Sequence, residues 1–342
     1  MKCERMTRDL SLLKGISNMK EFDLIIIGGG PAGLSAAISA AKKGIQNIAV
    51  VDRLNSAGGM LTQCFHRGFG VGMYGEGLSG PEFISKMLST SDTREINILT
   101  NSFVSTVEED FTVNIVNEEG LLQAKPKAII VATGCRETPI GSLDVYGSRP
   151  AGVFTAGSVQ KMINLYGYKF GKRAIVLGSG DVGLIVSHHL TETGTEVIAI
   201  IEKLGQITGL VKNKSLYIDS HNIPVIANCT ITALHGEERL EAVSICNVDG
   251  TGKPDFDSEK IIECDTLITS VGLIPELEII RNLNLNFSGN SLDVADPPST
   301  SIPNLFICGN AHNIHSIVDT VVAEGTLAGE LAADYILNQQ AI

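Results

Sequence analysis

The chain has few basic residues, no long apolar run and no apolar secretory core at its start. It carries 26 lysines and arginines against 38 aspartates and glutamates, a net charge of −12. Such an acidic balance argues against nucleic acid or an anionic membrane surface as the main partner. Its apolar stretches are broken by glycine or charge before the roughly 18 residues that a membrane span needs, and the opening "MKCERMTRDL" is polar. We expect a cytoplasmic protein without a membrane span.

The seven cysteines lack the spacing of a redox or metal motif. There is no C-x-x-C, so we expect reduced thiols, most of them buried as small apolar side chains, and no metal site. The adjacent pair His188 and His189 is expected on a helix, and without other ligands it does not predict a metal site either. The cysteines are Cys3, Cys64, Cys135, Cys229, Cys246, Cys264 and Cys308.

The sequence does contain a repeated pattern for binding a dinucleotide. "FDLIIIGGGPAGLSAAISAAKKG" and "RAIVLGSGDVGLIVSHHLTETGTE" each pass from an apolar strand through a glycine-rich turn into a helical segment. In both copies the next strand ends in an acidic residue, placed to accept hydrogen bonds from a ribose diol. Every member of the second copy follows its counterpart by 150 positions, so the chain is predicted to bind two dinucleotides. The members are Gly28, Gly30, Gly33 and Asp52, then Gly178, Gly180, Gly183 and Glu202.

The three glycines of each copy are expected to have different roles. The first permits the tight turn, the second lets the backbone approach a pyrophosphate, and the third lets the helix pack on the strand. The N–H groups at the start of the helix then face the phosphates, whose charge the helix dipole also favours.

Each nucleotide unit is followed by short strands separated by polar turns. We therefore predict an α/β fold with two nested Rossmann-like dinucleotide-binding domains, each a parallel sheet with helices plus a small antiparallel β-meander. The first domain covers residues 21–150 and the second covers residues 151–280. Residues 281–342 return to complete the first domain, because this tail has a strand and a long helix but no nucleotide unit of its own. Residues 1–20 are expected to form an N-terminal extension.

These features resemble the two-dinucleotide flavoproteins of the pyridine nucleotide-disulphide oxidoreductase superfamily, which includes thioredoxin reductase. The resemblance covers about residues 21–340 and includes "VATG" at residues 131–134 and "TSIPNLFICGN" at residues 300–310. It implies FAD in the first unit and NAD(P)H in the second, with the segment that ends at Asn310 holding the flavin ribityl chain. Asn310 stands where the superfamily usually has Asp, and its amide still forms hydrogen bonds to a hydroxyl.

The repeat and the resemblance together give a set of expected cofactor-binding residues. Glu202 favours NADH over NADPH, because a carboxylate accepts both ribose hydroxyls but repels a 2′-phosphate. Lys203 beside it would soften that repulsion, but "IEKLGQITGL" lacks the arginine pair expected of an NADP site. The expected residues are Gly28, Gly30, Pro31, Ala32, Gly33, Asp52, Arg53, Gly59, Met60, Ala132, Thr133, Gly134, Gly178, Gly180, Asp181, Val182, Gly183, Glu202, Gly272, Gly309 and Asn310.

Longer strings indicate a narrower group within the superfamily. "GGMLTQCFHRGFG", "ATGCRE", "RPAGVFTAGSVQKMIN" and "ECDTLITSVGLIPE" are similar to a subfamily of FAD/NAD(P)-binding flavoproteins without the redox disulphide. Members of this subfamily resemble electron-transfer subunits of dye-linked amino-acid or glycerol-3-phosphate dehydrogenase complexes. The resemblance implies a partner dehydrogenase subunit or electron carrier, in a homo- or hetero-oligomer.

Cys64 lies where one branch of the superfamily places a redox-active cysteine pair, yet it has no sequence neighbour to act as its partner. The thioredoxin reductase branch places C-x-x-C before the second glycine unit, where this chain has no cysteine. A disulphide relay needs a second sulfur close by. We therefore predict hydride transfer between NADH and FAD, and electron transfer to a partner or acceptor without a thiol step. The alternatives are an NADH oxidase, a peroxidase or a thioredoxin-reductase-like thiol enzyme using Cys64, and a non-catalytic FAD-binding scaffold subunit.

The candidate catalytic residues are Cys64, His66, His315 and Asp319, and His312 is a further acid-base candidate. His315 and Asp319 are favoured because the segment after "ICGN" in related folds reaches the pyrimidine edge of the flavin. A helix that begins there would stabilise negative charge on the reduced flavin.

Overall fold

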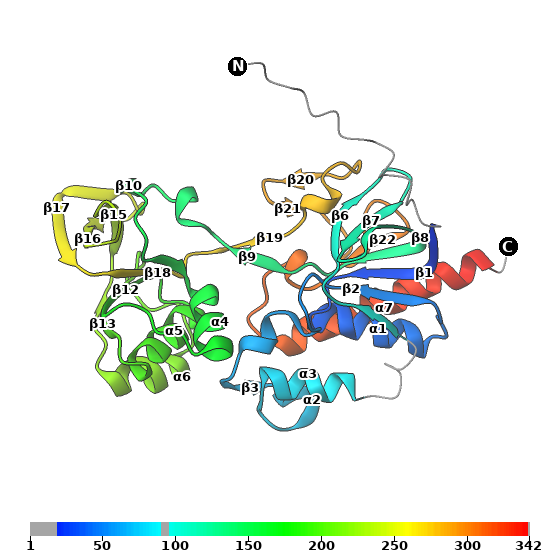
Figure 1. Cartoon of the computed structure of the whole chain (residues 1–342), viewed down its shortest axis with the longest axis horizontal. Helices are drawn as coiled ribbons and strands as arrows, with labels where there is room; N and C mark the ends of the chain where they lie inside the picture. Colours follow the sequence, from blue (N-terminus) through cyan, green and yellow to red (C-terminus); the bar gives the residue numbers. More distant parts are fainter. Residues whose placement is uncertain (1–18, 90–95, 341–342) are drawn as a thin grey trace, which may run out of the picture. The chain divides into compact units, whose positions relative to one another are not determined.

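The computed structural model describes residues 19–89 and 96–340, so nearly all of the expected extension at residues 1–20 lies outside the described residues. The chain forms two compact units (Figure 1). Unit 1 comprises Met1–Cys135 and Pro275–Ile342, and unit 2 comprises Arg136–Ile274. The cofactor that each unit holds, and the domain limits at residues 150 and 280, stay predictions.

A parallel sheet forms the centre of unit 1. Its strands are β1 Lys20–Ile27, β2 Ile48–Val51, β5 Ile96–Leu99, β8 Gly120–Val131 and β22 Leu305–Ile307. They run in the order β5-β2-β1-β8-β22 and all pair in parallel. The beginning of β8 also pairs antiparallel with β7 Val113–Asn117, which pairs with β6 Phe103–Val107. The predicted parallel sheet with an antiparallel meander is confirmed.

Two helices cover one face of this sheet (Figure 1). They are α1 Pro31–Lys42 and α7 Val318–Gln340, and their small side chains pack on Leu24 and Ile26 of β1. The two helices are so close that a side chain at Gly325 or Gly329 of α7 would collide with backbone carbonyl groups of α1. Glycine at these two positions permits the close packing. The return of α7 therefore brings the last segment of the chain against the helix that follows the first glycine loop.

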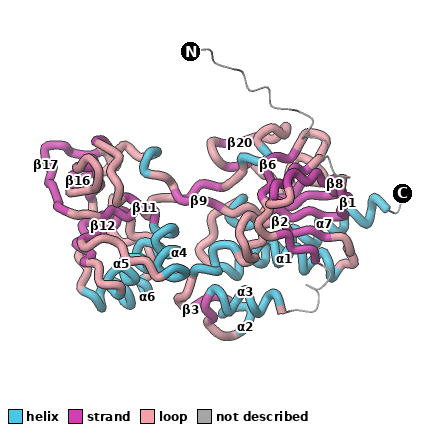
Figure 2. The backbone as a smooth tube through the Cα atoms, in the orientation of Figure 1, coloured by secondary structure: helices cyan, strands magenta, loops and turns pink. Residues whose placement is uncertain are grey.

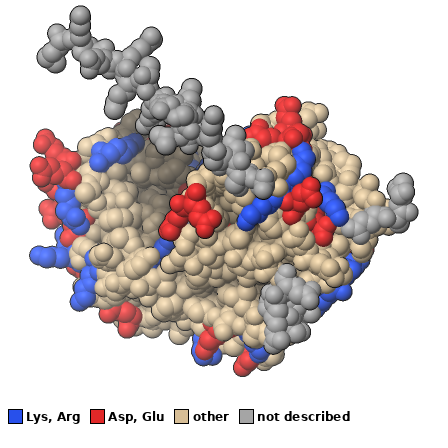
Figure 3. Space-filling view, turned by 45° about the vertical axis from the view of Figure 1, so that its right-hand side comes forward, with Lys and Arg blue, Asp and Glu red and all other residues tan. Residues whose placement is uncertain are grey.

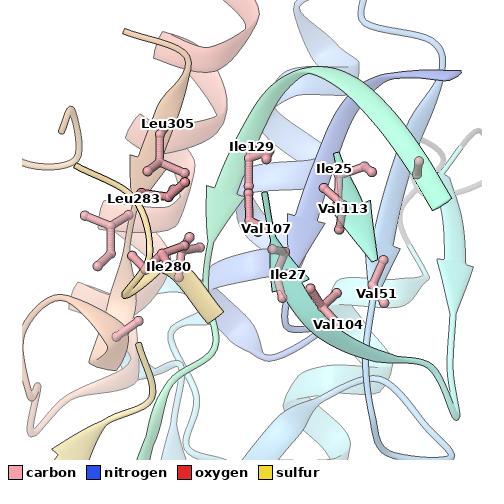
Figure 4. Packing of buried hydrophobic residues seen from close by; sticks show 14 of the residues in the cluster. Ile25, Ile27, Val51, Val104, Val107, Val113, Ile129, Ile280, Leu283 and Leu305 are labelled. Atoms are coloured by element: carbon pink, nitrogen blue, oxygen red, sulfur yellow. The ribbon is translucent and has the colours of Figure 1, made fainter. Parts of the chain in front are cut away.

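The other face of the sheet packs against the meander and the segment around residue 280. Figure 4 shows Ile25 and Ile27 of β1 near Val113 of β7, with Ile280 and Leu305 completing the cluster. Residues alternate along β1 between the two faces, and both faces are buried. Both faces of a parallel sheet are normally covered in this way, which explains the unbroken apolar run in the sequence.

Unit 2 repeats this plan. Its parallel strands are β11 Val153–Thr155, β12 Arg173–Leu177, β13 Glu196–Ile201, β14 Val225–Ile226 and β18 Thr266–Thr269, in the order β11-β18-β12-β13-β14. The strands β15 Cys229–His235, β16 Ala242–Val248 and β17 Pro254–Glu263 form an antiparallel meander. Helix α5 Asp181–Glu192 has 12 residues, as α1 has, and begins 150 positions after it.

The remaining elements are helical segments of at most 11 residues and strands of two or three residues, joined by the loops that Figure 2 shows in pink. In unit 1 they are η2 Gly59–Gln63, β3 Arg67–Phe69, α2 Val71–Tyr74, β4 Leu78–Ser79, α3 Gly80–Leu88, η7 Glu278–Ile280, β20 Phe287–Ser288, β21 Ser291–Leu292 and η8 Gly309–Ala311. In unit 2 they are η4 Ile140–Ser142, β10 Tyr146–Gly147, α4 Ala156–Tyr166, α6 Val211–Asn213, η5 Lys214–Ile218 and η6 Asp219–His221. The chain passes between the units within β9 Cys135–Glu137 and β19 Leu273–Pro275.

Acidic and basic side chains lie near one another in several mixed groups on the face that Figure 3 shows. Exposed ion pairs such as Lys125 with Asp110 and Arg67 with Glu82 have N–O distances of 2.7 and 2.9 Å. Pairs of this kind contribute about 0–1 kcal/mol each, so the buried layers hold the fold. Within residues 19–89 and 96–340, every helix is too short or too polar to cross a membrane.

Candidate functional site

The first glycine loop follows β1 and combines two crowded positions with one open position. A side chain at Gly28, whose φ is +111°, would collide with the carbonyl oxygen of Ala132, and a side chain at Gly33 would collide with that of Gly28. A Cβ on Gly30 would meet only the Cα of Gly59, at 4.0 Å. Two of the glycines are therefore needed by the fold, and the middle one leaves space beside the backbone for a ligand.

Helix α1 begins at this open position. Its N-cap is Gly30, its first residue is Pro31, and no side chain of the described residues caps its first turn. The N–H groups of the first turn, beginning at Ala32, therefore keep their capacity to bind an anion. The open glycine and the uncapped helix start fit the pyrophosphate of a dinucleotide.

The carboxylate of Asp52 holds this loop in shape. Asp52 is 7% exposed, and its Oδ2 accepts a hydrogen bond from the N–H of Gly29 at 2.7 Å, while its Oδ1 accepts one from the N–H of Leu54 at 2.8 Å. The sequence indicated a contact with a ribose, and the structure adds an anchoring role. Each oxygen has a further lone pair for a hydroxyl, so the ribose contact stays a prediction.

Glu276, which the sequence did not indicate, connects two of the predicted segments. Its Oε2 lies 2.8 Å from Nη1 of Arg53. Its backbone N–H donates to the carbonyl of Gly134 at 3.0 Å, and its carbonyl accepts the hydroxyl of Thr133 at 2.6 Å. Glu276 therefore holds the end of the "VATG" segment beside Arg53. Glu276 lies more than 140 positions after Thr133 and Gly134 in the chain, and no short sequence motif indicated its role.

Cys64 follows η2, which contains Gly59 and the exposed Met60. Its thiol donates to the carbonyl of Met60 at 3.3 Å. Burial raises the pKa of Cys64 to about 12, so the thiol is neutral near pH 7. The ring of His66 packs against Phe69 with the two centroids 4.8 Å apart. Neither geometry resembles the activated thiol and paired base of a nucleophilic site.

Glu324 on α7 connects two histidines of the segment after "ICGN". Its Oε1 lies 2.7 Å from Nδ1 of His312, and its Oε2 lies 2.8 Å from Nε2 of His315. The same Oε2 accepts the N–H of Gly309 at 2.7 Å, and the side chain of Asn310 accepts the N–H of His315 at 3.0 Å. The structure thus brings the predicted residues Gly309, Asn310 and His315 together around a carboxylate that the sequence analysis missed.

Asp319 is engaged elsewhere. Its Oδ1 accepts the N–H of Met73, in α2, at 3.2 Å. The cluster around Glu324, in contrast, lies next to the start of α1. Its member Gly309 is so close to Ala32 that a Cβ on Gly309 would lie 2.7 Å from the Cβ of Ala32. The two favoured residues His315 and Asp319 therefore belong to separate hydrogen-bonded groups in unit 1, and only the first group adjoins the glycine loop.

The second glycine loop has the same three-part geometry in unit 2. A side chain at Gly178, whose φ is +101°, would collide with the carbonyl of Ser270, and one at Gly183 would collide with that of Gly178. No atom of the described residues beyond the chain neighbours lies within 4 Å of a Cβ on Gly180. Helix α5 begins here with Gly180 as its N-cap and without a side-chain cap. This loop also fits a pyrophosphate.

Glu202 anchors the second loop as Asp52 anchors the first. It is 5% exposed; its Oε2 accepts the N–H of Ser179 at 2.9 Å and the Ser179 hydroxyl, and its Oε1 accepts the N–H of Leu204 at 2.8 Å. Asp181, at the start of α5, accepts hydrogen bonds from Leu210 N–H and the Asn213 amide.

The other two predicted residues of unit 2 lie at the surface and in a turn. Val182 is partly exposed on α5. Gly272 has a φ of +80°, and its carbonyl accepts the N–H of Thr138 at 3.1 Å. The positive φ explains the glycine, and its contact with a cofactor stays a prediction.

Known proteins are similar to this chain along most of its length. Residues 22–325 match the family model described as pyridine nucleotide-disulphide oxidoreductase. The chain is 25% identical over 327 residues to the "34.2 kDa protein in rubredoxin operon" of Clostridium pasteurianum, which covers 93% of this chain and 98% of that protein. It is 24% identical over 341 residues to "Hydrogen cyanide synthase subunit HcnB" of Pseudomonas protegens, covering 93% of this chain and 71% of that protein.

Solved structures show the same fold. Thioredoxin reductase of T. acidophilum superposes with a TM-score of 0.72 at 22% identity, over 94% of this chain and 100% of that chain. Together with the family match over residues 22–325, this likeness bears out the resemblance inferred from the two glycine loops. The chain belongs to the pyridine nucleotide-disulphide oxidoreductase family and is an FAD-dependent pyridine nucleotide oxidoreductase.

Proposed function

We propose that this protein transfers hydride between NADH and FAD and exchanges electrons with a partner protein or other acceptor without a redox disulphide. The observation that carries the proposal is the state of Cys64, the first cysteine that follows the first glycine loop in the sequence. Its thiol is partly buried and bonded to a backbone carbonyl, and desolvation raises its pKa to about 12. The thiol is therefore neutral at pH 7, and only the thiolate is a nucleophile.

We assign FAD to the loop at Gly28–Gly33 of unit 1 and NADH to the loop at Gly178–Gly183 of unit 2. When bound, these cofactors supply the hydride chemistry, and the protein supplies binding, orientation and exclusion of water. Gly30 and Gly180 leave the space that a pyrophosphate needs beside the backbone. Asp52 and Glu202 stabilise the two loops by accepting hydrogen bonds from the backbone N–H groups of Gly29 and Ser179. In this proposal Glu324 holds Gly309 and His315 at the flavin, through the bonds described above.

The preference for NADH is supported by the surroundings of Glu202. A carboxylate at this position repels the 2′-phosphate of NADPH. Lys203, the nearest basic residue in the sequence, extends toward Gly252, where a Cβ would lie 2.7 Å from its Cε. The ammonium group of Lys203 is therefore directed toward the turn between β16 and β17. In this proposal it does not offset the repulsion between the Glu202 carboxylate and a 2′-phosphate.

An electron-transfer role in a larger assembly is supported by the names of two relatives. One similar protein is encoded in a rubredoxin operon, and another is a subunit of hydrogen cyanide synthase. We therefore include a partner dehydrogenase subunit or electron carrier in the proposal, in either direction of electron flow.

The proposal is tested by Cys64→Ser and Cys64→Ala in steady-state reduction of an artificial dye by NADH, with FAD content measured in each preparation. We expect both variants to keep activity within about tenfold of wild type, because no thiol step is required. A loss of several orders of magnitude with FAD still bound would instead favour a thiol enzyme. If oxygen consumption disappears selectively, an oxidase or peroxidase that uses Cys64 is favoured. Failure of NADH to bleach the flavin of the wild-type protein would point to a scaffold subunit.

A further inference from the structure

Three potential metal ligands lie together in unit 2, away from the glycine loop. His188 and Glu192 are one turn apart on α5, and His221 is the last residue of η6. One ligand atom from each lies within 4.8 Å of the other two. His221 follows His188 by 33 positions, so the third ligand joins the pair on α5 only through the folding of the chain.

The distances suit a small cation. Nδ1 of His188 lies 2.9 Å from Nε2 of His221, and this Nε2 lies 3.6 Å from Oε1 of Glu192. Four-coordinate zinc with bonds of about 2.0–2.1 Å places neighbouring ligand atoms roughly 3.3 Å apart. Both distances fall within about half an ångström of that value, and the ligand atoms of His188 and Glu192 lie within 4.8 Å of each other. Movement of the exposed Glu192 carboxylate would complete three corners of a tetrahedron, with water as the fourth ligand.

The chemistry of the three groups also favours a cation. The His188 ring stacks on Tyr217 with centroids 5.0 Å apart, which fixes its orientation. Glu192 ends α5, where the helix dipole disfavours a carboxylate and a bound cation would relieve that repulsion.

We propose that His188, Glu192 and His221 form a site for a divalent transition metal ion, with Zn²⁺ as the expected occupant. Binding replaces the hydrogen bond between the two rings. The proton of that bond moves to the other nitrogen of its own ring, so both coordinating nitrogens present lone pairs to the metal ion. Two imidazoles and one carboxylate suit zinc better than the hard cations Mg²⁺ and Ca²⁺, which prefer oxygen ligands.

The position of the site gives it a structural consequence. The segment from Leu210 to His221 is tied to the start of α5 by Asp181, which accepts Leu210 N–H at 2.8 Å and the Asn213 amide at 2.7 Å. A metal ion would tie the same segment to the end of α5 through His221. The ion would therefore stabilise unit 2 by linking two elements at both ends of the helix, and this inference does not depend on the proposed electron acceptor.

The test is titration of the chelator-treated FAD-loaded protein with Zn²⁺, followed by calorimetry and by thermal unfolding. The variants are His221→Gln and Glu192→Gln. The control is His235→Gln, which alters a histidine of β15 that is bonded to Ser244. We expect one zinc equivalent in wild type and control, a higher unfolding temperature with zinc in both, and affinity at least about tenfold weaker in the two ligand variants.

Glu192 is exposed, so Glu192→Gln should fold even if His221→Gln does not. The two ligand variants separate this site from zinc binding by cysteines elsewhere in the chain, because zinc held by cysteines would keep its affinity in both. The proposal is overturned if wild-type protein binds no zinc, or if both ligand variants bind it with wild-type affinity.

Discussion

Replacing Asp52 by Asn removes one charge and one acceptor from the group that holds the first glycine loop. The Asn oxygen can accept either the Gly29 N–H or the Leu54 N–H, and its NH₂ group then faces the other donor. Asp52 is 7% exposed, so water does not readily replace the lost partner. The loss of a hydrogen bond to a charged group costs about 1.5–3 kcal/mol.

The cost is expected to appear as weaker FAD binding. If the destabilised loop adopts its binding conformation less often, the apparent dissociation constant rises in proportion. A cost of about 2 kcal/mol corresponds to roughly 30-fold. The measurement is titration of apoprotein with FAD, followed by quenching of flavin fluorescence.

Glu202→Gln is the matched control, because it makes the same change in the second loop. We expect Glu202→Gln to keep FAD affinity within about twofold of wild type and to weaken NADH binding instead. The reason is that Glu202 holds the glycine loop of unit 2, whereas Asp52 holds that of unit 1. Wild-type FAD affinity in Asp52→Asn would refute the anchoring role. An equal loss of FAD affinity in both variants would refute the assignment of one cofactor to each loop.

Three further predictions, one of them with a control variant, test other parts of the account. Gly30→Val should abolish FAD binding and the yellow colour, because its side chain occupies the open space beside the loop; full FAD occupancy in the purified variant would contradict this. Glu324→Ala should lower the free energy of unfolding in urea by about 2–4 kcal/mol, because Gly309 and two histidines lose their partner. The control is Asp334→Ala, which alters the same helix as Glu324 and breaks its exposed ion pair with Lys43. It should lower the free energy of unfolding by at most about 1 kcal/mol, and an equally small loss in Glu324→Ala would show that the Glu324 cluster is not stabilising. Glu202→Arg should shift the ratio of kcat/KM toward NADPH by reversing the charge near the ribose, although activity with both nucleotides should fall because Ser179 and Leu204 lose their acceptor; an unchanged ratio would mean that Glu202 does not read the ribose.

The fold was predictable because its signals are local and repeated. Gly28 and Gly178 adopt positive φ angles and pack against carbonyl groups of a neighbouring strand segment, so the sequence has to carry glycine at both places. The apolar strands before them and the helices after them follow the same spacing, which predicts two units of the same type. Such patterns survive in the sequence because each depends on a few adjacent residues.

The groups that complete the sites were not predictable in this way. Glu276 forms an ion pair with Arg53, far from it in the sequence, and Glu324 on α7 contacts His312, 12 positions earlier and outside that helix. No short sequence motif indicated the role of Glu276. His221 likewise meets His188 through folding alone. Contacts of this kind depend on tertiary packing, which periodicity and spacing do not encode.

The buried state of the two acidic residues was the other feature that the sequence did not reveal. Spacing placed Asp52 and Glu202 after their strands, where a ribose is expected. The structure shows that both carboxylates accept backbone N–H groups of their own loops. The ribose contact stays a prediction, and the spacing of the residues did not indicate these hydrogen bonds to the backbone.

The absence of a thiol step is tested most directly by counting electrons. The FAD-loaded protein is titrated anaerobically with NADH while the flavin absorbance is recorded to its end point. The account predicts full reduction at about one NADH, or two electrons, per FAD, because it assigns no disulphide partner to Cys64, whose thiol is neutral with a pKa raised to about 12. Uptake of about four electrons per FAD, with half of that uptake lost in Cys64→Ser, would reveal a second two-electron centre and contradict the account.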